Sequence, residues 1–254
     1  MAGGTSSPET AQTPVAILCG GRGTRLQEHT YAIPKALVEI GGKPILWHVI
    51  RIYAGQGFRR FLLLTGYLGD QVQAFASAEP WPEAVEVECL DTGLETPTGG
   101  RVARAADRLG ERTFCLTYAD GVADIDLDSE LGFHARQGAE VTMAVVRPRI
   151  QWGVAVVDDA ERVTGFREKP RLDDWVNGGF FVCEPGFLGR LDPDSVLEHG
   201  PLERAAERGE LAAYRHHGFW ECMDTYKDAT TLNDLWDSGA PPWRVWERIG
   251  ARAR

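Results

Sequence analysis

Residues 14–26 read Pro-Val-Ala-Ile-Leu-Cys-Gly-Gly-Arg-Gly-Thr-Arg-Leu, and residues 34–44 read Pro-Lys-Ala-Leu-Val-Glu-Ile-Gly-Gly-Lys-Pro. The apolar run 15–18 predicts a buried strand, and the glycines after it form a loop whose backbone N–H groups can surround an anion. Two cations, Arg25 and Lys35, follow this loop. Such a loop suits a polyphosphate, because fixed cations neutralise charge that collects on phosphate oxygens during transfer. The stretch therefore predicts a nucleotide-handling site at the end of the first strand.

The spacing excludes two common glycine-rich loops. A P-loop requires a Lys-Ser or Lys-Thr pair after its last glycine, and none follows here. The dinucleotide fingerprint G-x-G-x-x-G requires glycine where Leu26 stands. A plain strand-to-helix turn would need only the glycines. Thr24, Arg25 and Lys35 go beyond the needs of a turn, which favours the nucleotide site.

Length and composition agree with a soluble enzyme and narrow the class of protein little. At 254 residues with 43% hydrophobic content, the chain is long enough to bury one sizeable core. No apolar run approaches the roughly 18 residues of a membrane span. The five cysteines are scattered singly, as expected for small buried side chains in a reducing compartment. Residues 1–13 lack the basic and apolar regions of a signal peptide, so we expect a disordered tail there and a cytoplasmic protein.

The net charge of −10 argues against a nucleic-acid partner, whose binding surface would carry a basic excess. An acidic protein still binds polyanions locally, through Mg²⁺ and a few placed cations.

Strand-like and helix-like patterns alternate through the first half of the chain, which predicts an α/β fold with a Rossmann-like, mixed, mostly parallel sheet and helices on both faces. The second half changes to apolar strands joined by short turns, followed by two helices. No repeat, linker or domain boundary is visible, so we expect a single domain over 14–254. The predicted strands are 15–18, 61–65, 85–90, 114–118, 141–146, 154–157, 163–166 and 179–183, and the predicted helices are 45–54, 70–77, 101–109, 202–207 and 229–236.

Two aspartates are candidates for holding a metal. Open α/β sheets bind ligands at the carboxyl ends of their strands, and Asp120 follows the predicted strand 114–118 directly. Asp224 precedes the last helical pattern. Mg²⁺ in phosphoryl transfer needs one or two carboxylates besides phosphate oxygens and water. Taken alone, Asp120 is equally well explained by a turn before Gly121, and Asp224 is better explained by a helix N-terminus.

The chain resembles the glucose-1-phosphate cytidylyltransferase branch of the nucleoside-diphosphate-sugar pyrophosphorylases over nearly all of residues 14–247. The glycine loop matches the family signature [AG]-G-G-x-G-T-R-L followed by Pro-Lys. Thr98-Gly-Gly-Arg101 is more telling, because relatives that use UTP or dTTP usually carry other residues around the base. Further matching segments occur in family order and begin at Val38, Thr65, Asp91, Thr117, Arg167, Asn177, Gly218 and Met223.

This resemblance implies a GT-A-like sugar nucleotidyltransferase fold, with a nucleotide-binding half over about 14–125 and a sugar-phosphate-binding half over about 126–254. It implies Mg²⁺-dependent transfer of a cytidylyl group from CTP to a sugar 1-phosphate, foremost α-D-glucose 1-phosphate, with neither nucleic acid nor membrane as a partner. The implied catalytic residues are Arg25, Lys35 and Asp120, and the implied metal ligands are Asp120 and Asp224. The implied nucleotide-binding residues are Cys19, Gly20, Gly21, Gly23, Thr24, Thr98, Gly99, Gly100 and Arg101. The implied sugar-phosphate-binding residues are Tyr118, Gly121, Trp152, Gly153, Glu168, Lys169, Asn177 and Gly178.

Arg101 is the candidate reader of the cytosine base, because guanidinium donors complement the O2 and N3 acceptors of cytosine. The alternative is an exposed arginine at the start of a helix. For Lys169 the alternative is a solvated lysine at a strand end. His48 belongs to an apolar helix and is expected to be packed, while the pair His216-His217 stays open as a lining element.

The chain departs from the family pattern in three places. The segment between Tyr67 and Asp91 is shorter, so the oligomeric state does not transfer, and a homo-oligomer is one expectation. Residues 147–153 differ from the family's run, which leaves a sugar phosphate other than glucose 1-phosphate open. Ala36-Leu37 replaces Pro-Met, a tolerable apolar exchange.

Two alternatives remain to cytidylyl transfer: the same reaction with another nucleotide or phosphorylated acceptor, and a non-catalytic nucleotide-sensing protein. The presence of both aspartates and all three cations of the pattern favours an enzyme.

Overall fold

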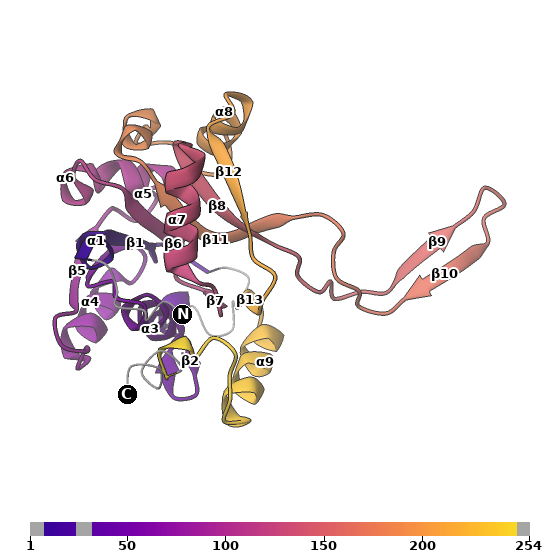
Figure 1. The fold of residues 1–254 in the computed structure, drawn as a ribbon. Helices are drawn as coiled ribbons and strands as arrows, with labels where there is room; N and C mark the ends of the chain where they lie inside the picture. The colour runs from indigo at the N-terminus through magenta and orange to yellow at the C-terminus, as the bar shows by residue number, and fades with distance from the viewer. Residues whose placement is uncertain (1–7, 24–31, 248–254) are drawn as a thin grey trace, which may run out of the picture.

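Strand β1 (Pro14–Leu18) lies inside a seven-stranded mixed sheet with the order β12-β8-β11-β6-β1-β4-β5 (Figure 1). The computed structural model describes residues 8–23 and 32–247. Strand β1 pairs in parallel with β4 (Arg60–Thr65) and β6 (Phe114–Tyr118), and β4 pairs in parallel with β5 (Glu86–Asp91). Strand β11 (Val176–Cys183) is antiparallel to β6 and to β8 (Val141–Val146), while β12 (Leu211–Arg215) adds to β8 in parallel. These pairings confirm the predicted mixed, mostly parallel sheet.

Both faces of the sheet are covered by helices, as the uninterrupted apolar run of β1 requires. Val15 and Ile17 point into one core, and Ala16 and Leu18 into the other, because successive side chains of a strand alternate in direction. The first core is packed by α3 (Ile45–Gly55), α4 (Gly69–Ala78), α7 (Leu127–Gln137) and α9 (Tyr226–Asp237). The second is packed by α5 (Thr98–Arg104), α6 (Ala106–Leu109), the 3-10 helix η3 (Pro185–Arg190) and α8 (Pro201–Glu207).

Small elements line the edge where β1 and β6 end. Strand β7 (Gly121–Ala123) pairs in antiparallel fashion with β13 (Trp220–Cys222). The 3-10 helix η2 (Lys35–Leu37) leads into a short hairpin of β2 (Glu39–Ile40) and β3 (Lys43–Pro44). Within the described ranges, no helix has both the length and the apolar character needed to cross a bilayer.

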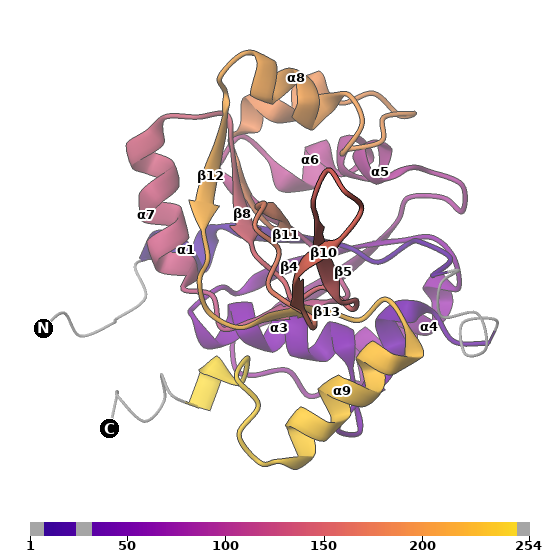
Figure 2. The ribbon, with the colours of Figure 1, turned by 90° about the vertical axis from the view of Figure 1, so that its right-hand side faces the viewer.

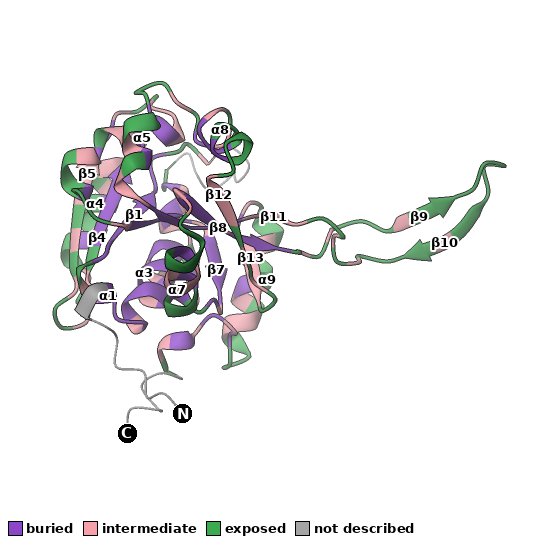
Figure 3. Ribbon diagram, turned by 45° about the horizontal axis from the view of Figure 1, so that its top comes forward, coloured by how far each residue is buried: buried purple, intermediate pink, exposed green. Residues whose placement is uncertain are grey.

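A two-stranded hairpin projects from this body (Figures 1 and 2). Its strands β9 (Val154–Val157) and β10 (Val163–Arg167) pair with each other and with no other strand of the described residues. A backbone bridge between Arg149 and Arg171 closes the inner end. We call residues 147–175 the arm. Figure 3 shows that most of the outer arm is exposed.

The structure confirms every predicted strand to within a few residues, and four of the predicted helices. The predicted helix 101–109 is wrong in detail: the chain forms α5 and α6, separated at Ala105. Within the segment 1–13, predicted as a disordered tail, residues 8–12 form helix α1 (Pro8–Gln12), and residues 1–7 lie outside the described residues.

The unpredicted elements include β7, α7, β12 and β13. Helix α7 has an Asp126 side chain that accepts a hydrogen bond from Ser129 N at its start, but few apolar residues mark its buried face.

Candidate active site

The ladder of β7 and β13 brings Asp120 and Asp224 together. Asp120 stands in the turn between β6 and β7, and Asp224 lies between β13 and α9. Cys222 pairs with Gly121 across the ladder, and Met223 N donates a hydrogen bond of 2.9 Å to Asp120 O. The two carboxylates therefore converge because the strands beside them are hydrogen-bonded.

Lys35 lies between these carboxylates. Its Nζ donates to Asp120 Oδ2 and to Asp224 Oδ1, both at 2.6 Å. Burial of the ammonium lowers the pKa of Lys35, but the charge of Asp120 and the hydrogen bonds to both aspartates outweigh it, so the net pKa is raised. The amine therefore stays protonated and counters the negative charge of the pair.

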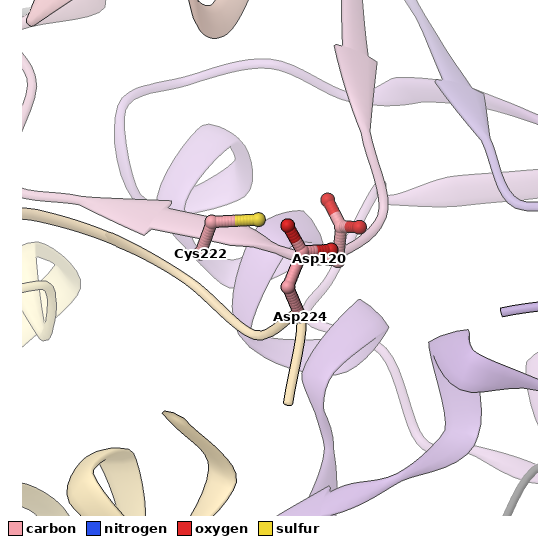
Figure 4. A group of neighbouring side chains, drawn as sticks. All are labelled: Asp120, Cys222 and Asp224. Atoms are coloured by element: carbon pink, nitrogen blue, oxygen red, sulfur yellow. The ribbon is translucent and has the colours of Figure 1, made fainter. Parts of the chain in front are cut away.

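The thiol of Cys222 borders the same pair (Figure 4). One ligand atom each from Asp120, Cys222 and Asp224 lie within 4.8 Å of one another. Burial, followed by the charge of Asp120, raises the pKa of the Cys222 thiol, so the carboxylates are the charged donors. Two carboxylates are the hard oxygen ligands that Mg²⁺ prefers, so the side chains fit a divalent cation.

The glycine loop forms one wall of a cavity of about 360 Å³ beside the carboxylates. Cys19 N donates to Leu64 O at 3.2 Å, and Tyr67 N donates to Gly20 O at 3.0 Å, so the loop is fixed to the end of β4. This first cavity is lined by Leu18, Cys19, Gly20, Gly21, Gly23, Lys35, Ala36, Thr96, Pro97, Thr98, Arg101, Tyr118, Ala119, Asp120 and Asp224.

Arg101 supports this loop from behind. Its side chain is only 4% exposed, so the alternative of an exposed arginine is wrong. A Cβ at Gly20 would lie 2.2 Å from Arg101 Nη1, and one at Gly66 would lie 2.4 Å from it, so a side chain at either position would displace the guanidinium. The two terminal nitrogens donate to the carbonyl oxygens of Gly20, Thr65, Gly93 and Leu94 and to Thr92 Oγ1, at 2.7–3.3 Å. The guanidinium thus ties the glycine loop to the segment after β5.

A second cavity of about 330 Å³ adjoins the first. It is lined by Thr117, Tyr118, Asp120, Gly121, Asn177, Gly178, Gly179, Trp220, Cys222 and Asp224. Tyr118, Asp120 and Asp224 line both cavities. The carboxylate pair therefore stands at the junction of two spaces, one walled by the glycine loop and the other by β11 and β13.

A hydrogen-bond chain crosses this junction. The Tyr118 hydroxyl donates to Glu198 Oε1, and Thr98 Oγ1 donates to Glu198 Oε2 at 2.8 Å. Asn177 Nδ2 donates to the Tyr118 hydroxyl at 3.4 Å. Burial, followed by the charge of Glu198, raises the pKa of Tyr118, so this group is a neutral hydrogen-bonding phenol.

Sequence reasoning missed several residues of the site, among them Cys222, Glu198, Trp220 and Gly179. Glu198 lies in the loop before α8, where no motif marks it. Trp220 donates from Nε1 to Gly178 O at 2.7 Å, and Gly179 lines the second cavity next to Gly178. Trp220 and Gly179 lie in segments that match the family pattern, and this match could have identified them as site residues.

Several predicted site residues lie elsewhere. Gly99 and Gly100 line neither cavity; a Cβ there would lie 2.8 Å from Ser195 Cβ and 1.9 Å from Pro193 O, respectively, so close packing requires these glycines. Trp152, Gly153, Glu168 and Lys169 belong to the arm and line neither cavity. Thr24 and Arg25 lie outside the described residues.

Lys169 is half exposed and lies 3.8 Å from Glu168. Its backbone adopts a left-handed conformation with φ of 44°, which is uncommon for a residue other than glycine. Gln151, at the inner end of the arm, accepts a hydrogen bond of 2.8 Å from Lys227 of α9. The inner end of the arm therefore contacts the element that follows Asp224.

No histidine of the described residues lines either cavity. His48 is fully buried with Nε2 at 2.8 Å from Ile40 O, and burial lowers its pKa to about 4, which confirms that it is packed. His216 lies beside Phe219 O and Asp124, and the His217 ring contacts Trp175. His216 and His217 therefore do not line either of the two cavities.

An α/β sheet with a phosphate-suited glycine loop and a carboxylate pair at its strand ends defines an enzyme class that handles nucleoside triphosphates. A family model described as nucleotidyl transferase matches residues 15–238, and the chain belongs to this family. It is 40% identical to a probable glucose-1-phosphate cytidylyltransferase of Bacillus subtilis over 91% of this chain and 98% of that protein. It is 38% identical, with the same coverage, to the glucose-1-phosphate cytidylyltransferase of Salmonella typhi. The resemblance found in the sequence is therefore confirmed.

Solved structures share the fold. HddC from Yersinia pseudotuberculosis superimposes with a TM-score of 0.70 at 20% identity, covering 89% of this chain and 100% of that one. A putative glucose-1-phosphate thymidylyltransferase from Bacillus anthracis gives a TM-score of 0.67 at 17% identity, covering 88% of this chain and 94% of that one. These likenesses confirm the predicted sugar nucleotidyltransferase fold.

Proposed function

We propose that this protein transfers a cytidylyl group from CTP to a sugar 1-phosphate, foremost α-D-glucose 1-phosphate, and releases pyrophosphate. The observation that carries the proposal is the pair of adjoining cavities that share Asp120 and Asp224. A transfer reaction needs two substrates whose reacting phosphates meet, and the carboxylate pair stands where the two spaces join. The choice of CTP and glucose 1-phosphate rests on the names of the relatives that match nearly the whole chain.

In this proposal the first cavity holds the nucleotide. Backbone amides of the loop around Gly20 and Gly21 face the triphosphate, and Arg101 keeps that loop in place from behind. The ammonium of Lys35 lines this cavity, so it neutralises charge on the phosphate that is transferred.

The second cavity holds the sugar 1-phosphate. Asn177, Tyr118 and the backbone around Gly178 provide hydrogen-bonding groups for sugar hydroxyls. The Trp220 indole fixes Gly178 through its hydrogen bond, so the wall of this cavity is set before the substrate binds.

Asp120 and Asp224 would hold a divalent cation, Mg²⁺ in this proposal, whose charge would offset the repulsion between two polyanionic substrates. The chain's own contribution is to keep both carboxylates beside Lys35 at the cavity junction.

The chemistry needs no covalent enzyme intermediate. An oxygen of the sugar phosphate attacks the α-phosphorus of CTP, a new P–O bond forms, and the bond to pyrophosphate breaks on the opposite side. A phosphate monoester dianion is already a competent nucleophile, so no general base is required.

Several roles remain predictions: phosphate binding by Arg25 and Thr24, nucleotide binding by Gly99 and Gly100, and sugar-phosphate binding by the arm residues Trp152, Gly153, Glu168 and Lys169. Cytosine reading by Arg101 also stays a prediction, but its hydrogen bonds to four carbonyl oxygens and to Thr92 favour support of the glycine loop instead. A different nucleotide or phosphorylated acceptor is the second candidate, favoured by the unusual run of residues 147–153.

The test is release of pyrophosphate with Mg²⁺, measured for CTP, UTP, dTTP, ATP and GTP against a panel of sugar 1-phosphates. We expect release chiefly with CTP and glucose 1-phosphate. Turnover confined to another pair would keep the reaction and change its substrates. Silence over the whole panel, with nucleotide still bound, would contradict the proposed activity.

A further inference from the structure

Two arginines gather on one tryptophan ring at the start of β11. The guanidinium carbon of Arg147 lies 4.5 Å from the centroid of the Trp175 ring, and that of Arg215 lies 5.5 Å from it. The His217 ring stands at 83° to the same tryptophan, with the two ring centroids 5.3 Å apart. We call Arg147, Trp175 and Arg215 the arginine cluster.

The arginine cluster carries a net positive charge. Among the described residues, no ion pair joins Arg147 or Arg215 to a carboxylate, and the nearby Asp173 pairs with Arg167 at 3.4 Å. A further cation lies close, because Arg171 Nη1 donates to Arg147 O at 3.1 Å. Contact with a ring occupies the flat face of a guanidinium and leaves its N–H edge free for a carboxylate or a phosphate.

The sheet register places this cluster beside the second cavity. Val145 of β8 pairs with Asn177 on one side and with Arg215 on the other, so the three side chains leave the same face of the sheet. Asn177 lines the second cavity. Trp175 precedes Asn177 by two residues, and Arg147 follows Val145 by two. The cluster therefore continues the wall of the second cavity toward the edge of the sheet.

The cluster lies on the side of this cavity away from the carboxylate pair. The strands follow the order β6-β11-β8-β12, with Asp120 just beyond β6, Arg147 just beyond β8, and Arg215 at the end of β12. Neighbouring strands are about 4.8 Å apart, so β8 lies about 10 Å and β12 about 14 Å from β6. The ring of a hexose together with an arginine side chain spans such a distance. A hexose whose 1-phosphate lies at Asp120 therefore points its far end toward the cluster.

We propose that the arginine cluster binds a second anionic group on the acceptor, a carboxylate or a phosphate on carbon 6 of a hexose 1-phosphate. The guanidinium forks of Arg147 and Arg215 match the oxygens of either group. This inference rests on the proposed function, because it takes the second cavity as the place of the sugar 1-phosphate. It adds a selectivity for acceptors that carry a negative charge at each end.

The first experiment measures binding of three sugars to the full-length protein by calorimetry, with and without Mg²⁺ and the unreactive analogue α,β-methylene-CTP. The sugars are glucose 1-phosphate, glucose 1,6-bisphosphate and glucuronic acid 1-phosphate. We expect at least one doubly anionic sugar to have a Kd about tenfold to a hundredfold below that of glucose 1-phosphate, the effect of one or two charge-assisted hydrogen bonds. Which of the two binds tighter identifies the group as a phosphate or a carboxylate. Equal Kd values for the three sugars, or no binding of any, would overturn the proposal.

Variants locate the effect. Arg147→Gln with Arg215→Gln should bring the Kd of the doubly anionic sugar to within about threefold of that of glucose 1-phosphate. Arg136→Gln, which replaces an exposed arginine of α7, is the matched control and should keep the wild-type ratio of Kd values. The readout is a ratio of two sugars on one protein, so a loss of folded protein cancels. An unchanged ratio in the double variant would overturn the assignment to the arginine cluster.

Pyrophosphate release separates this inference from the proposed function. Turnover of glucose 1-phosphate with CTP, combined with equal Kd values for the three sugars, would keep the proposed function and overturn the role of the arginine cluster. Absence of turnover with every sugar, combined with a Kd ratio that depends on Arg147 and Arg215, would overturn cytidylyl transfer and support the anion site.

Discussion

The carboxylates at the strand ends and the carboxyl group of Glu130 beneath the sheet are accommodated in opposite ways. Asp120 and Asp224 share the ammonium of Lys35 at 2.6 Å. Glu130, on α7, is 1% exposed, and its Oε1 has no hydrogen-bond partner among the described residues. Burial raises the pKa of Glu130 to about 8. The carboxylates at the proposed substrate site are thus ionised and paired with a lysine. The carboxyl group of Glu130, buried away from that site, is kept neutral by its surroundings.

The largest expected loss of activity comes from removing the negative charge of Asp120, one of the two aspartates that pair with Lys35. Asp120→Asn should lower the rate of pyrophosphate release by about a hundredfold to a thousandfold, because charge-positioning groups contribute on that scale. Asp107→Asn, on the exposed surface of α6, is the matched control and should retain the wild-type rate. If Asp120→Asn and Asp107→Asn lost the same share of the rate at saturating substrates, Asp120 would have no special role in catalysis.

Glu130→Gln tests the unpaired group. The folded pKa of about 8 lies above the ordinary value of 4.5, so the unfolded chain releases its proton first and stability falls as pH rises from about 4.5 to 8. At pH 7 this costs up to about 3 kcal/mol, from 1.36 kcal/mol per unit. The variant should show a flatter profile and a higher free energy of unfolding at pH 8 than the wild type. Urea unfolding between pH 5 and 9 checks this, and parallel profiles would show that Glu130 is ionised or solvated.

Arg101 is a third case, a buried cation held by carbonyl oxygens. Arg101→Gln removes the hydrogen bonds that tie the glycine loop to the segment after β5, so the KM for the nucleotide should rise about tenfold to a hundredfold, with the preference for CTP over UTP little changed. Arg104→Gln, which removes one bond to Thr92 O outside the cavities, is the control. A collapsed preference for CTP with an unchanged KM would instead identify Arg101 as the reader of the base.

The smallest expected effect is on inhibition by Cd²⁺, and it depends on the thiol of Cys222 beside Asp120 and Asp224. Soft ligands select thiophilic cations, so Cd²⁺ should inhibit the wild type at a several-fold lower concentration than it inhibits Cys222→Ser. Cys89→Ser, with a thiol away from the site, should behave as the wild type. A thiolate-to-cadmium absorption band in the ultraviolet that disappears in Cys222→Ser gives a readout independent of turnover. Equal inhibition of all three proteins would remove Cys222 from the metal environment.

The sheet was predictable because its strands are short apolar runs bounded by turns. Helix α7 and strand β13 escaped prediction, since one has few apolar residues and the other is only three residues long. The arm strands were predicted as well, but not their exposure. An apolar pattern predicts that a segment forms a strand, but it does not show whether the rest of the chain buries that strand.

The candidate site was predicted where the family motifs name its residues. Lys35, Asp120 and Asp224 converge as the resemblance implied. Glu198 was missed because its role depends on a contact with Tyr118 that joins distant parts of the chain. The packing of Gly99 and Gly100 against residues 193–195 is a tertiary contact of the same kind, which no local spacing reveals.

The narrow inner end of the arm has a consequence for how this family diversifies. Leu172 N donates to Pro148 O at 2.9 Å and Ile150 N donates to Pro170 O at 3.0 Å, so the two chain segments leave the body side by side. The entropy of closing a loop changes slowly with its length, so the segment beyond these bonds can be lengthened, trimmed or exchanged with little strain on the sheet. Evolution can therefore change the outer hairpin without disturbing the sheet or the two cavities, and the residues of the arm predicted to bind the sugar phosphate can change along with it.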